Sequence, residues 1–271
     1  MTVPIQSVLA PNPSLFTGQG TNTYLVGAPD VVLIDPGPDD PVHLDAILAA
    51  ARAQTGTIRR ILLTHGHADH CAGAARLKER TGAPILGGAG LEGMDVTLED
   101  GDVVEAQRDA SLRALHTPGH AREHFCFLLE PDRILFSGDL IAGAGTIVIA
   151  PPEGNMSDYL GSLHRVQALG VRLVLPGHGP PVEEAPALIQ YYLDHRYARE
   201  QMILAAWRDG ARTVPEIVAR VYADVDPTRH PIAASSVRAH LEKLEQEGVI
   251  CGVTGEENGA ARFGVRGSVV L

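Results

Sequence analysis

Residues 65–70 read His-Gly-His-Ala-Asp-His and directly follow an apolar run at residues 61–63. This hexapeptide contains four side chains of the metal-ligand type, which are His65, His67, Asp69 and His70. Imidazole nitrogen and carboxylate oxygen together suit Zn²⁺ and related divalent metals. No packing requirement accounts for three His and one Asp so close together. The segment therefore predicts a metal site at the end of a strand.

Three later segments repeat the order of a short apolar run, a Gly or Pro, and one ligand-type residue. The runs lie at 112–115, 134–136 and 173–175, and they lead to His120, Asp139 and His178. Short apolar runs that end in Gly or Pro are typical of buried strands. Functional residues concentrate on loops that rigid strands position. We expect a β scaffold whose loops bring these ligands to one point.

The motif His-x-His-x-Asp-His, followed in order by Gly-His, Gly-Asp and Gly-His, resembles the metallo-β-lactamase superfamily. The resemblance covers roughly residues 20–182 and implies an αββα sandwich with a dinuclear metal site at its edge. It implies that His65, His67 and His120 bind the first metal. Asp69, His70 and His178 would bind the second metal, and Asp139 would bridge the two.

This resemblance also implies a chemistry. A bound divalent metal lowers the pKa of its water from ~15.7 to about 7, and two metals ~3.5–4 Å apart can hold a bridging hydroxide. Such a site would hydrolyse an ester, thioester, lactone, amide or phosphodiester without a Ser or Cys nucleophile. The expected catalytic residues are Asp69, which would orient the hydroxide, and Asp139. The expected cofactors are two Zn²⁺, with Mn²⁺ or Fe²⁺ as alternatives.

At several motif positions this chain differs from individual branches of the superfamily, and these differences argue against some of the activities found in it. The zinc enzymes that hydrolyse β-lactam antibiotics place Cys where this chain has Asp139, and flavo-di-iron relatives place Glu where it has His67. Glyoxalase II and the persulfide dioxygenases share the hexapeptide motif. Glyoxalase II uses basic residues of its helical C-terminal part to hold glutathione, and this chain has only two lysines, Lys78 and Lys243.

Two further polar residues are candidates for the surroundings of the metal site. Asp35, in Leu-Ile-Asp-Pro-Gly at 33–37, resembles the first-strand Asp of the family. It would fix the second ring nitrogen of a metal-bound His, or it would simply form a turn before Pro-Gly. His124 would line the pocket or support a ligand, with ordinary packing as the alternative.

Composition indicates a water-soluble enzyme. The 271 residues allow one or two domains, and the hydrophobic share of 45% includes no run near the ~18 residues that a membrane span needs. The first residues lack a basic segment and an apolar core, so we expect no signal peptide. Three cysteines that lie far apart suit a reducing compartment. We therefore expect a cytoplasmic protein without membrane attachment.

The charge is uneven along the chain. Residues 1–195 hold 12 Lys and Arg against 23 Asp and Glu, whereas residues 196–271 hold 10 of each kind, which accounts for the net charge of −11. An acidic surface of this kind is not expected to attract nucleic acid broadly.

The C-terminal part differs in pattern. A helical periodicity over 188–207 ends at Gly210, and a short helix follows with Thr213 as its N-cap and Glu216 completing a capping box. A third helix is expected to begin at Ser235-Ser236 and to end at Gly248. The segments 249–253 and 261–265 then read as a two-stranded wing. These observations predict a catalytic domain over 1–190 and a small, mostly helical, winged-helix-like domain over 191–271.

The winged-helix-like module has basic residues that could meet phosphates, namely Arg229, Arg238 and Lys243, but three glutamates share the third helix. These glutamates would repel a nucleic-acid backbone. We therefore expect no sequence-specific DNA binding, and we expect the module to serve packing, homodimer formation or closure over a substrate.

The combination of the two parts resembles the lactamase-beta-like protein 2 group. The phrases that carry this resemblance are GTNTYLV at 20–26, TPGH at 117–120, PGHGP at 176–180 and HLEKLEQEG at 240–248. Members of this group are single-strand endoribonucleases, and related fungal enzymes are thioesterases that release polyketides from acyl carriers. The resemblance thus implies a zinc hydrolase that acts on single-stranded RNA or on a small thioester or ester.

Two alternatives from other classes stay open. One is a mononuclear iron enzyme that resembles the persulfide dioxygenases. The other is a ligand-sensing regulator in which the winged helix does the work. The complete set of seven ligands favours the hydrolase, because a sensor needs neither a bridging carboxylate nor an activated water.

Overall fold

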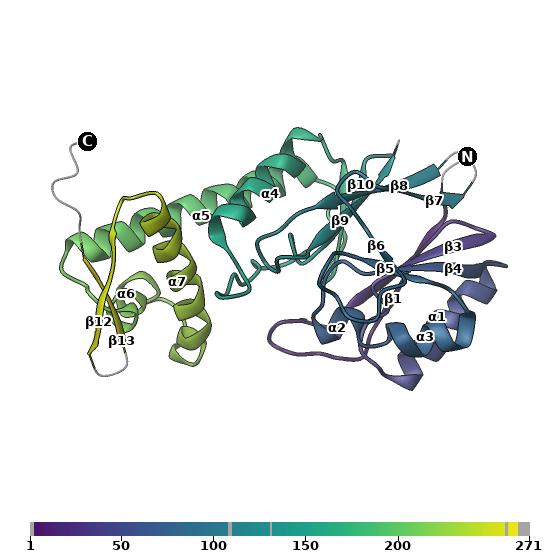
Figure 1. The fold of residues 1–271 in the computed structure, drawn as a ribbon, viewed down its shortest axis with the longest axis horizontal. Helices are drawn as coiled ribbons and strands as arrows, with labels where there is room; N and C mark the ends of the chain where they lie inside the picture. The colour runs from purple at the N-terminus through teal and green to yellow at the C-terminus, as the bar shows by residue number, and fades with distance from the viewer. Residues whose placement is uncertain (1–2, 108–109, 131, 258–259, 265–271) are drawn as a thin grey trace.

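The computed structural model describes residues 3–107, 110–130, 132–257 and 260–264, and the side chains among them up to residue 250. Two mixed β-sheets pack face to face, helices cover both outer faces, and a helical module with a two-stranded wing extends from one end (Figure 1). The chain therefore forms the αββα sandwich, followed by the winged-helix-like module, that the sequence predicts.

The first sheet has the strand order β1-β2-β3-β4-β5-β6, and the second has the order β11-β10-β9-β8-β7. The strands of the first sheet are β1 (Ile5–Leu9), β2 (Asn22–Val26), β3 (Asp30–Ile34), β4 (Thr57–Leu62), β5 (Ile85–Gly87) and β6 (Val96–Thr97). Those of the second sheet are β7 (Val103–Gln107), β8 (Ala110–His116), β9 (Phe125–Glu130), β10 (Ile134–Gly138) and β11 (Leu173–Pro176).

Side-chain alternation along the strands builds the core. In β2 and β3, Val26 and Val32 face the second sheet, whereas Leu25 and Leu33 face the helices on the outside. Both faces of these strands are buried, which explains why their sequences are apolar runs without polar alternation. The second sheet contributes Phe127 to the space between the sheets.

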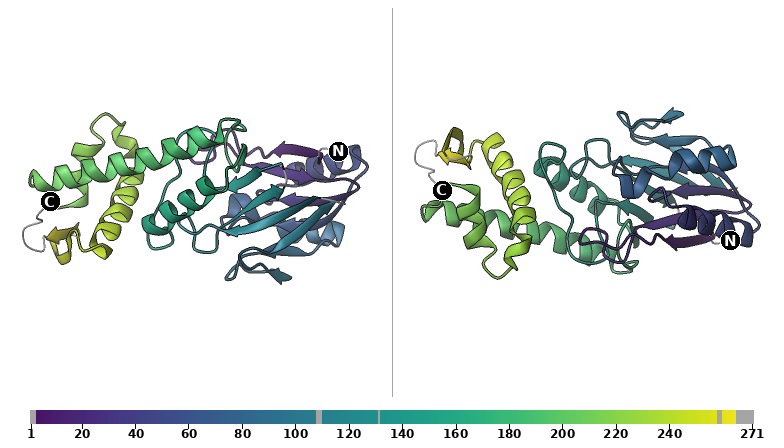
Figure 2. Two further views of the ribbon diagram at one scale, coloured as in Figure 1. Left: turned by 90° about the horizontal axis from the view of Figure 1, so that it is seen from above. Right: turned by 90° about the horizontal axis from the view of Figure 1, so that it is seen from below.

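Helices cover the two outer faces (Figure 2). The first sheet is covered by α1 (Pro41–Ala53) and α3 (Ala74–Thr81), and the second sheet by α4 (Met156–Ala168) and the start of α5 (Ala185–Arg208). Asp40 begins α1, because its carboxylate accepts hydrogen bonds from the N–H groups of Val42 and His43. Asn155 begins α4 in the same way.

The C-terminal module consists of the second half of α5, α6 (Val214–Val221), α7 (His230–Gln246), and the wing strands β12 (Cys251–Glu257) and β13 (Ala260–Gly264). The predicted capping box of Thr213 and Glu216 is present at the start of α6. Val265, which the sequence placed in the wing, lies outside the described residues. The proposed division at residue 190 falls inside α5, which is one continuous helix, so that boundary stays a prediction.

The prediction that the third helix begins at Ser235 is wrong, since α7 begins five residues earlier at His230. Pro231 occupies the first turn, where its missing N–H has no helical partner to lose. A 3₁₀ turn over Pro227–Arg229, capped by Asp226, leads directly into the helix. The serine pair therefore lies within the helix.

The module is fixed to the sandwich through α5 and α7. Within the module, the ammonium group of Lys243 on α7 lies 3.0 Å from a carboxylate oxygen of Glu200 in the second half of α5, and both side chains are buried. Ala239 on α7 belongs to the same apolar cluster as Leu163 on α4. In the part of the chain that the structure describes, no helix is both long enough and apolar enough to cross a membrane.

Candidate metal centre

Loops at one edge of the sandwich carry all seven predicted ligands. The loop after β4 and the short helix α2 (Ala68–Cys71) supply residues 65–70, and the loops after β8, β10 and β11 supply the others. Two groups form, and within each the ligand atoms lie within 4.8 Å of one another. The groups are His65, His67, His120 and Asp139, and Asp69, His70 and His178.

The first group is built around the Nδ1 atom of His67. The Nε2 atoms of His65 and His120 each lie 3.0 Å from it. Ligand atoms at about 2.0–2.1 Å from a tetrahedral zinc are roughly 3.3–3.4 Å apart, so this spacing fits ligands around one ion.

The second group is equally tight. The Nε2 atoms of His70 and His178 are 3.1 Å apart. A carboxylate oxygen of Asp69 lies 3.3 Å from His178 Nε2 and 3.7 Å from His70 Nε2. These three atoms have the mutual separations of ligands to a second ion.

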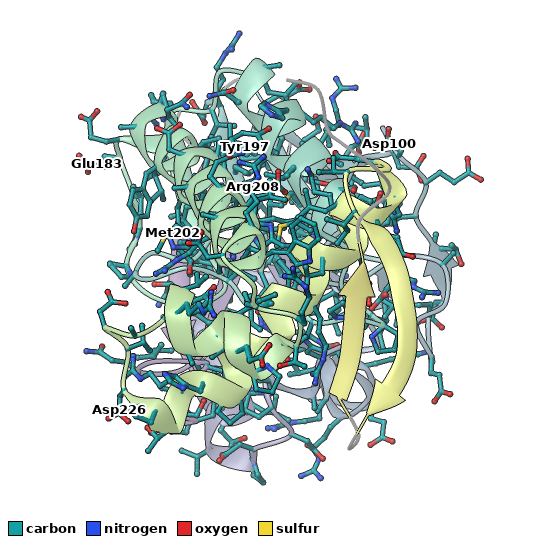
Figure 3. The ribbon with its side chains drawn as sticks, turned by 90° about the vertical axis from the view of Figure 1, so that its left-hand side faces the viewer. Asp100, Glu183, Tyr197, Met202, Arg208 and Asp226 are labelled. Atoms are coloured by element: carbon teal, nitrogen blue, oxygen red, sulfur yellow. The ribbon has the colours of Figure 1, made fainter. Side chains whose placement is uncertain are left out.

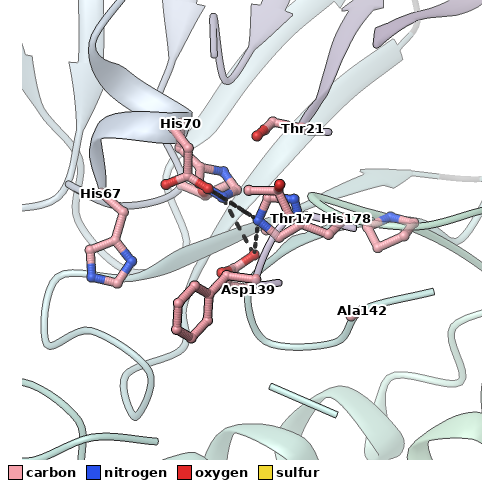
Figure 4. Close-up of polar contacts among 12 residues, drawn as sticks. Thr17, Thr21, His67, His70, Asp139, Ala142 and His178 are labelled. Atoms are coloured by element: carbon pink, nitrogen blue, oxygen red, sulfur yellow. Dashed lines mark hydrogen bonds and ion pairs between the residues drawn. The ribbon is translucent and has the colours of Figure 1, made fainter. Parts of the chain in front are cut away.

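Asp139 stands between the two groups (Figure 4). Its Oδ2 lies 3.4 Å from His120 Nε2, and its Oδ1 lies 3.4 Å from the Nε2 atoms of both His70 and His178. Gly138 brings it there with a φ of +46°, and a Cβ at that position would lie 2.7 Å from the Thr64 hydroxyl. Each oxygen of one carboxylate thus faces a different group, which is the placement of a bridging ligand.

The outward nitrogens of the histidines show which tautomer each adopts. His120 Nδ1 lies 3.0 Å from the carbonyl oxygen of Val148, and His178 Nδ1 lies 3.3 Å from that of Gly20. A carbonyl only accepts, so both Nδ1 atoms carry the proton. His70 Nδ1 likewise donates to the carboxylate of Asp35 over 2.9 Å.

His65 is held by a longer chain of hydrogen bonds. The Thr64 hydroxyl donates to Asp35 over 2.8 Å, so it accepts the Nδ1–H of His65 over 3.0 Å. In all four residues with a protonated Nδ1, the inward Nε2 therefore presents a lone pair. Lone pairs 3.0–3.1 Å apart repel unless a cation lies among them, and the donor set thus fits two divalent metals.

The electrostatics of the pair of groups favour a cation. Burial alone would lower the pKa of His70, but the carboxylates of Asp139 and Asp35 raise that pKa well above its ordinary value, so they favour positive charge at its Nε2, either as a proton or as a metal ion that takes the proton's place. Burial would raise the pKa of Asp139, but His70 and the neighbouring imidazoles hold it well below its ordinary value. Asp139 is therefore an ionised, buried carboxylate, which needs positive charge beside it.

Asp35 is the main support of the ligand loop. It is buried at the end of β3 with a positive φ of 52°, an unusual conformation for a residue other than glycine. One carboxylate oxygen accepts the backbone N–H of Thr64 over 2.8 Å, and the other accepts from Thr64 Oγ1 and His70. Asp35 thereby orients His70 directly and His65 through Thr64.

His124 supports Asp139 rather than lining the cavity. Its Nε2 accepts the backbone N–H of Asp139 over 3.1 Å, and its Nδ1 lies 2.9 Å from the Thr117 hydroxyl. Burial lowers the pKa of His124 to about 3, so the ring is neutral and able to accept. No role was predicted for Thr64 and Thr117 from the sequence, although Thr64 directly precedes His65 and Thr117 lies three residues before His120.

The metal centre opens into a cavity of about 960 Å³. Besides the ligand loops and Glu153, its lining comes from four parts of the chain: the loop at 12–18, the segment 142–150, the middle of α5, and the connection between α6 and α7 with the first turns of α7. Apolar side chains on these segments include Leu15, Phe16, Ile147, Val225 and Ile232. The C-terminal module thus forms one wall of the cavity into which the ligands point.

Comparison with known proteins places this arrangement in context. The profile of the metallo-beta-lactamase superfamily matches residues 16–178, and that of the beta-lactamase associated winged helix domain matches residues 213–253. The chain is 32% identical to a beta-lactamase-like protein 2 homolog of Caenorhabditis elegans, with 91% of this chain and 85% of the relative covered.

An atrochrysone carboxyl ACP thioesterase of Aspergillus chevalieri is 35% identical, with 83% of this chain and 75% of the relative covered. Among solved structures, a beta-lactamase domain protein from Burkholderia ambifaria superposes with a TM-score of 0.81 at 21% identity, covering 97% of this chain and 91% of that one. The fold, the two matched domains and these relatives agree: the chain is a member of the metallo-β-lactamase superfamily, with its associated winged-helix domain.

Proposed function

We propose that the protein is a dinuclear zinc hydrolase that cleaves a thioester or a related ester. The observation that carries this proposal is the opening of the seven-residue cluster into a cavity with apolar walls. Such a cavity suits an acyl chain, because apolar surface leaves water when it binds. The relative named as an ACP thioesterase supports the same choice. Hydrolase activity in general follows from membership of the superfamily.

We assign the proposed ligands to two zinc ions according to the two groups that their atoms form. His65, His67 and His120 would hold one zinc, Asp69, His70 and His178 the other, and Asp139 both. Two divalent cations held there would supply an activated water and polarise the carbonyl group that it attacks. In the overall reaction the C–S bond breaks, a C–O bond forms, and the products are a carboxylate and a thiol.

The protein side chains contribute position and charge. Asp139 is buried among imidazoles and keeps its negative charge, and we propose that it holds the two halves of the centre together. The side chain of Asp69 is 30% exposed and borders the cavity, so it can accept a hydrogen bond from the attacking water. Asp35 and His124 act as positioning residues through His70 and Asp139.

Replacement of Asp35 is expected to weaken metal binding. Asp35→Ala removes the acceptor of His70 Nδ1–H and of Thr64, so we expect the affinity for zinc to fall about 10- to 100-fold. Competition with a chromogenic chelator measures that affinity. The control is Asp39→Ala. It removes an exposed carboxylate that lies close to Asp35 in the chain and pairs with Arg76. An unchanged affinity in folded Asp35→Ala would mean that the carboxylate only shapes the turn.

Single-stranded RNA is the second candidate substrate, because arginines border the same cavity and could meet phosphates. The net charge of −11 weighs against a polynucleotide. A panel on the zinc-loaded protein tests both, with hexanoyl thioesters, aromatic esters, a lactone and a fluorogenic RNA oligomer. We expect the highest kcat/KM for a thioester. RNA cleavage with inert thioesters would reject the proposal, and iron-dependent oxygen uptake with a persulfide would indicate the dioxygenase.

A further inference from the structure

The cavity has two ends of opposite charge. The carboxylates in its lining are Asp69, Asp139 and Glu153, and all three belong to the metal centre or lie beside it. The far wall is formed by the C-terminal module and contains three arginines, which are Arg196, Arg199 and Arg229. No carboxylate among the described lining residues stands on that wall.

Arg196 is a buried cation. Its residue is 3% exposed, it lies over the ring of Tyr159 at 5.2 Å, and it donates to the carbonyl of Ile147. Its Nε–H has no hydrogen-bond partner, and among the described side chains no carboxylate forms an ion pair with it. A buried charge without a counter-ion is costly, so this side chain is prepared for an anion that arrives from the cavity.

Arg199 extends the positive wall from the same helix. It stands three residues after Arg196 and therefore on the same face of α5. One guanidinium nitrogen donates to the carbonyl of Val221 over 2.8 Å, and the guanidinium lies 4.4 Å from the centre of the Tyr222 ring. These contacts hold the group in place and leave other N–H groups of its fork for a ligand.

The start of α7 completes the wall. Arg229 lies where the 3₁₀ turn meets α7, and Ile232 and Ala233 of the first turn of α7 border the cavity. His195 also borders the cavity, and among the described residues its buried Nδ1 has no hydrogen-bond partner. Burial and the neighbouring Arg196 lower the pKa of His195 to about 4.

We propose that this wall binds a phosphate group on the thiol half of the thioester, as in a 4′-phosphopantetheine arm. The inference rests on the proposed thioesterase function, in which the carbonyl lies at the metal centre and the acyl chain along the apolar lining. A phosphate is an anion that clustered arginine forks recognise through charge-assisted hydrogen bonds. The thiol half carries it because acyl carriers present their thioesters on such an arm.

The test compares hydrolysis of hexanoyl-4′-phosphopantetheine with that of hexanoyl-pantetheine, which lacks only the phosphate. We expect kcat/KM to be about 10- to 100-fold higher for the phosphorylated ester, mainly through KM. Arg199→Gln and Arg229→Gln should each reduce that ratio about tenfold. Arg208→Gln, on the same helix but outside the cavity lining, is the matched control (Figure 3).

Binding provides a second measurement that needs no turnover. Calorimetry with S-methyl-4′-phosphopantetheine and S-methyl-pantetheine should show the same loss of preference in the two variants. Arg196→Met is included with a thermal melt, because this buried residue also contacts Tyr159. Hydrolysis of hexanoyl-coenzyme A is then compared with hydrolysis of a hexanoyl-loaded carrier protein. The better substrate shows whether the phosphate belongs to a free thioester or to a protein-bound one.

The outcomes are distinct. Thioester hydrolysis without any preference for the phosphorylated ester, or with a preference that both variants keep, overturns this inference and leaves the proposed function in place. Absence of thioester hydrolysis rejects the proposed function itself. RNA cleavage that falls in the arginine variants would assign the wall to a polynucleotide and would also overturn the inference.

Discussion

Asp139→Asn is expected to lower kcat/KM by at least about a thousandfold, since several kcal/mol of charge stabilisation is lost with a bridging carboxylate. The two oxygens of Asp139 face different ligand groups at 3.4 Å, and the amide nitrogen of Asn would replace one of them with a donor. One half of the centre would then lose its anionic ligand. Steady-state kinetics with the preferred ester and metal analysis of the same preparation measure both consequences.

A matched control separates charge from fold. Asp224→Asn makes the same chemical change at an exposed position in the connection between α6 and α7, and we expect wild-type kinetics. Asp69→Ala should lose activity together with the second metal. Full activity in Asp139→Asn with two metals still bound would show that the carboxylate does not bridge them.

Removal of the metals is the second large effect that we expect. A chelator should abolish activity and lower the melting temperature, because inward lone pairs 3.0–3.1 Å apart are left without a cation. A metal present at about 1,000 times its Kd stabilises the folded state by roughly 4 kcal/mol, or roughly 8–16 °C for a chain of this size. Differential scanning calorimetry and an activity assay, each before and after chelation, measure the two effects.

Adding single metals back to the chelated protein distinguishes which kind of metal the site uses. Zn²⁺ should restore both properties at two ions per chain, whereas Mg²⁺, which prefers a shell of oxygen ligands, should restore neither. A melting temperature that chelation leaves unchanged would contradict the paired metal sites. Recovery with one iron per chain would instead favour the dioxygenase chemistry.

The ligand cluster is the part of the site that the sequence predicts best. An apolar run precedes each ligand segment, with a Gly directly before His120, Asp139 and His178, and strand ends at one edge of a sandwich have few ways to direct such loops. The hydrogen bonds around the ligands are harder to predict. Asp35 reaches Thr64 and His70 across 29 and 35 residues, so sequence spacing does not distinguish this role from a simple turn.

Of the three arginines on the far wall of the cavity, the sequence offered only Arg229 as a residue that could meet phosphates. Arg196 and Arg199 lie on a helix whose periodic apolar residues draw attention to its packing, and their direction depends on how α6 and α7 fold back on α5. The start of α7 was missed for a local reason, because Pro231 reads as a break unless the preceding turn is known. Long-range packing decides both features.

Because α5 is a single helix of 24 residues, one continuous element both packs on the sandwich and supports the winged-helix module. Ile189 and Leu193 anchor its first half in the cluster on the second sheet, whereas Ile203 and Leu204 anchor its second half in the C-terminal cluster. A chimera that joins this catalytic half to a relative's module would therefore have to exchange α5 as a whole. Differences in substrate preference among related enzymes can then arise from residues on one face of α5, without any change in the metal-binding loops.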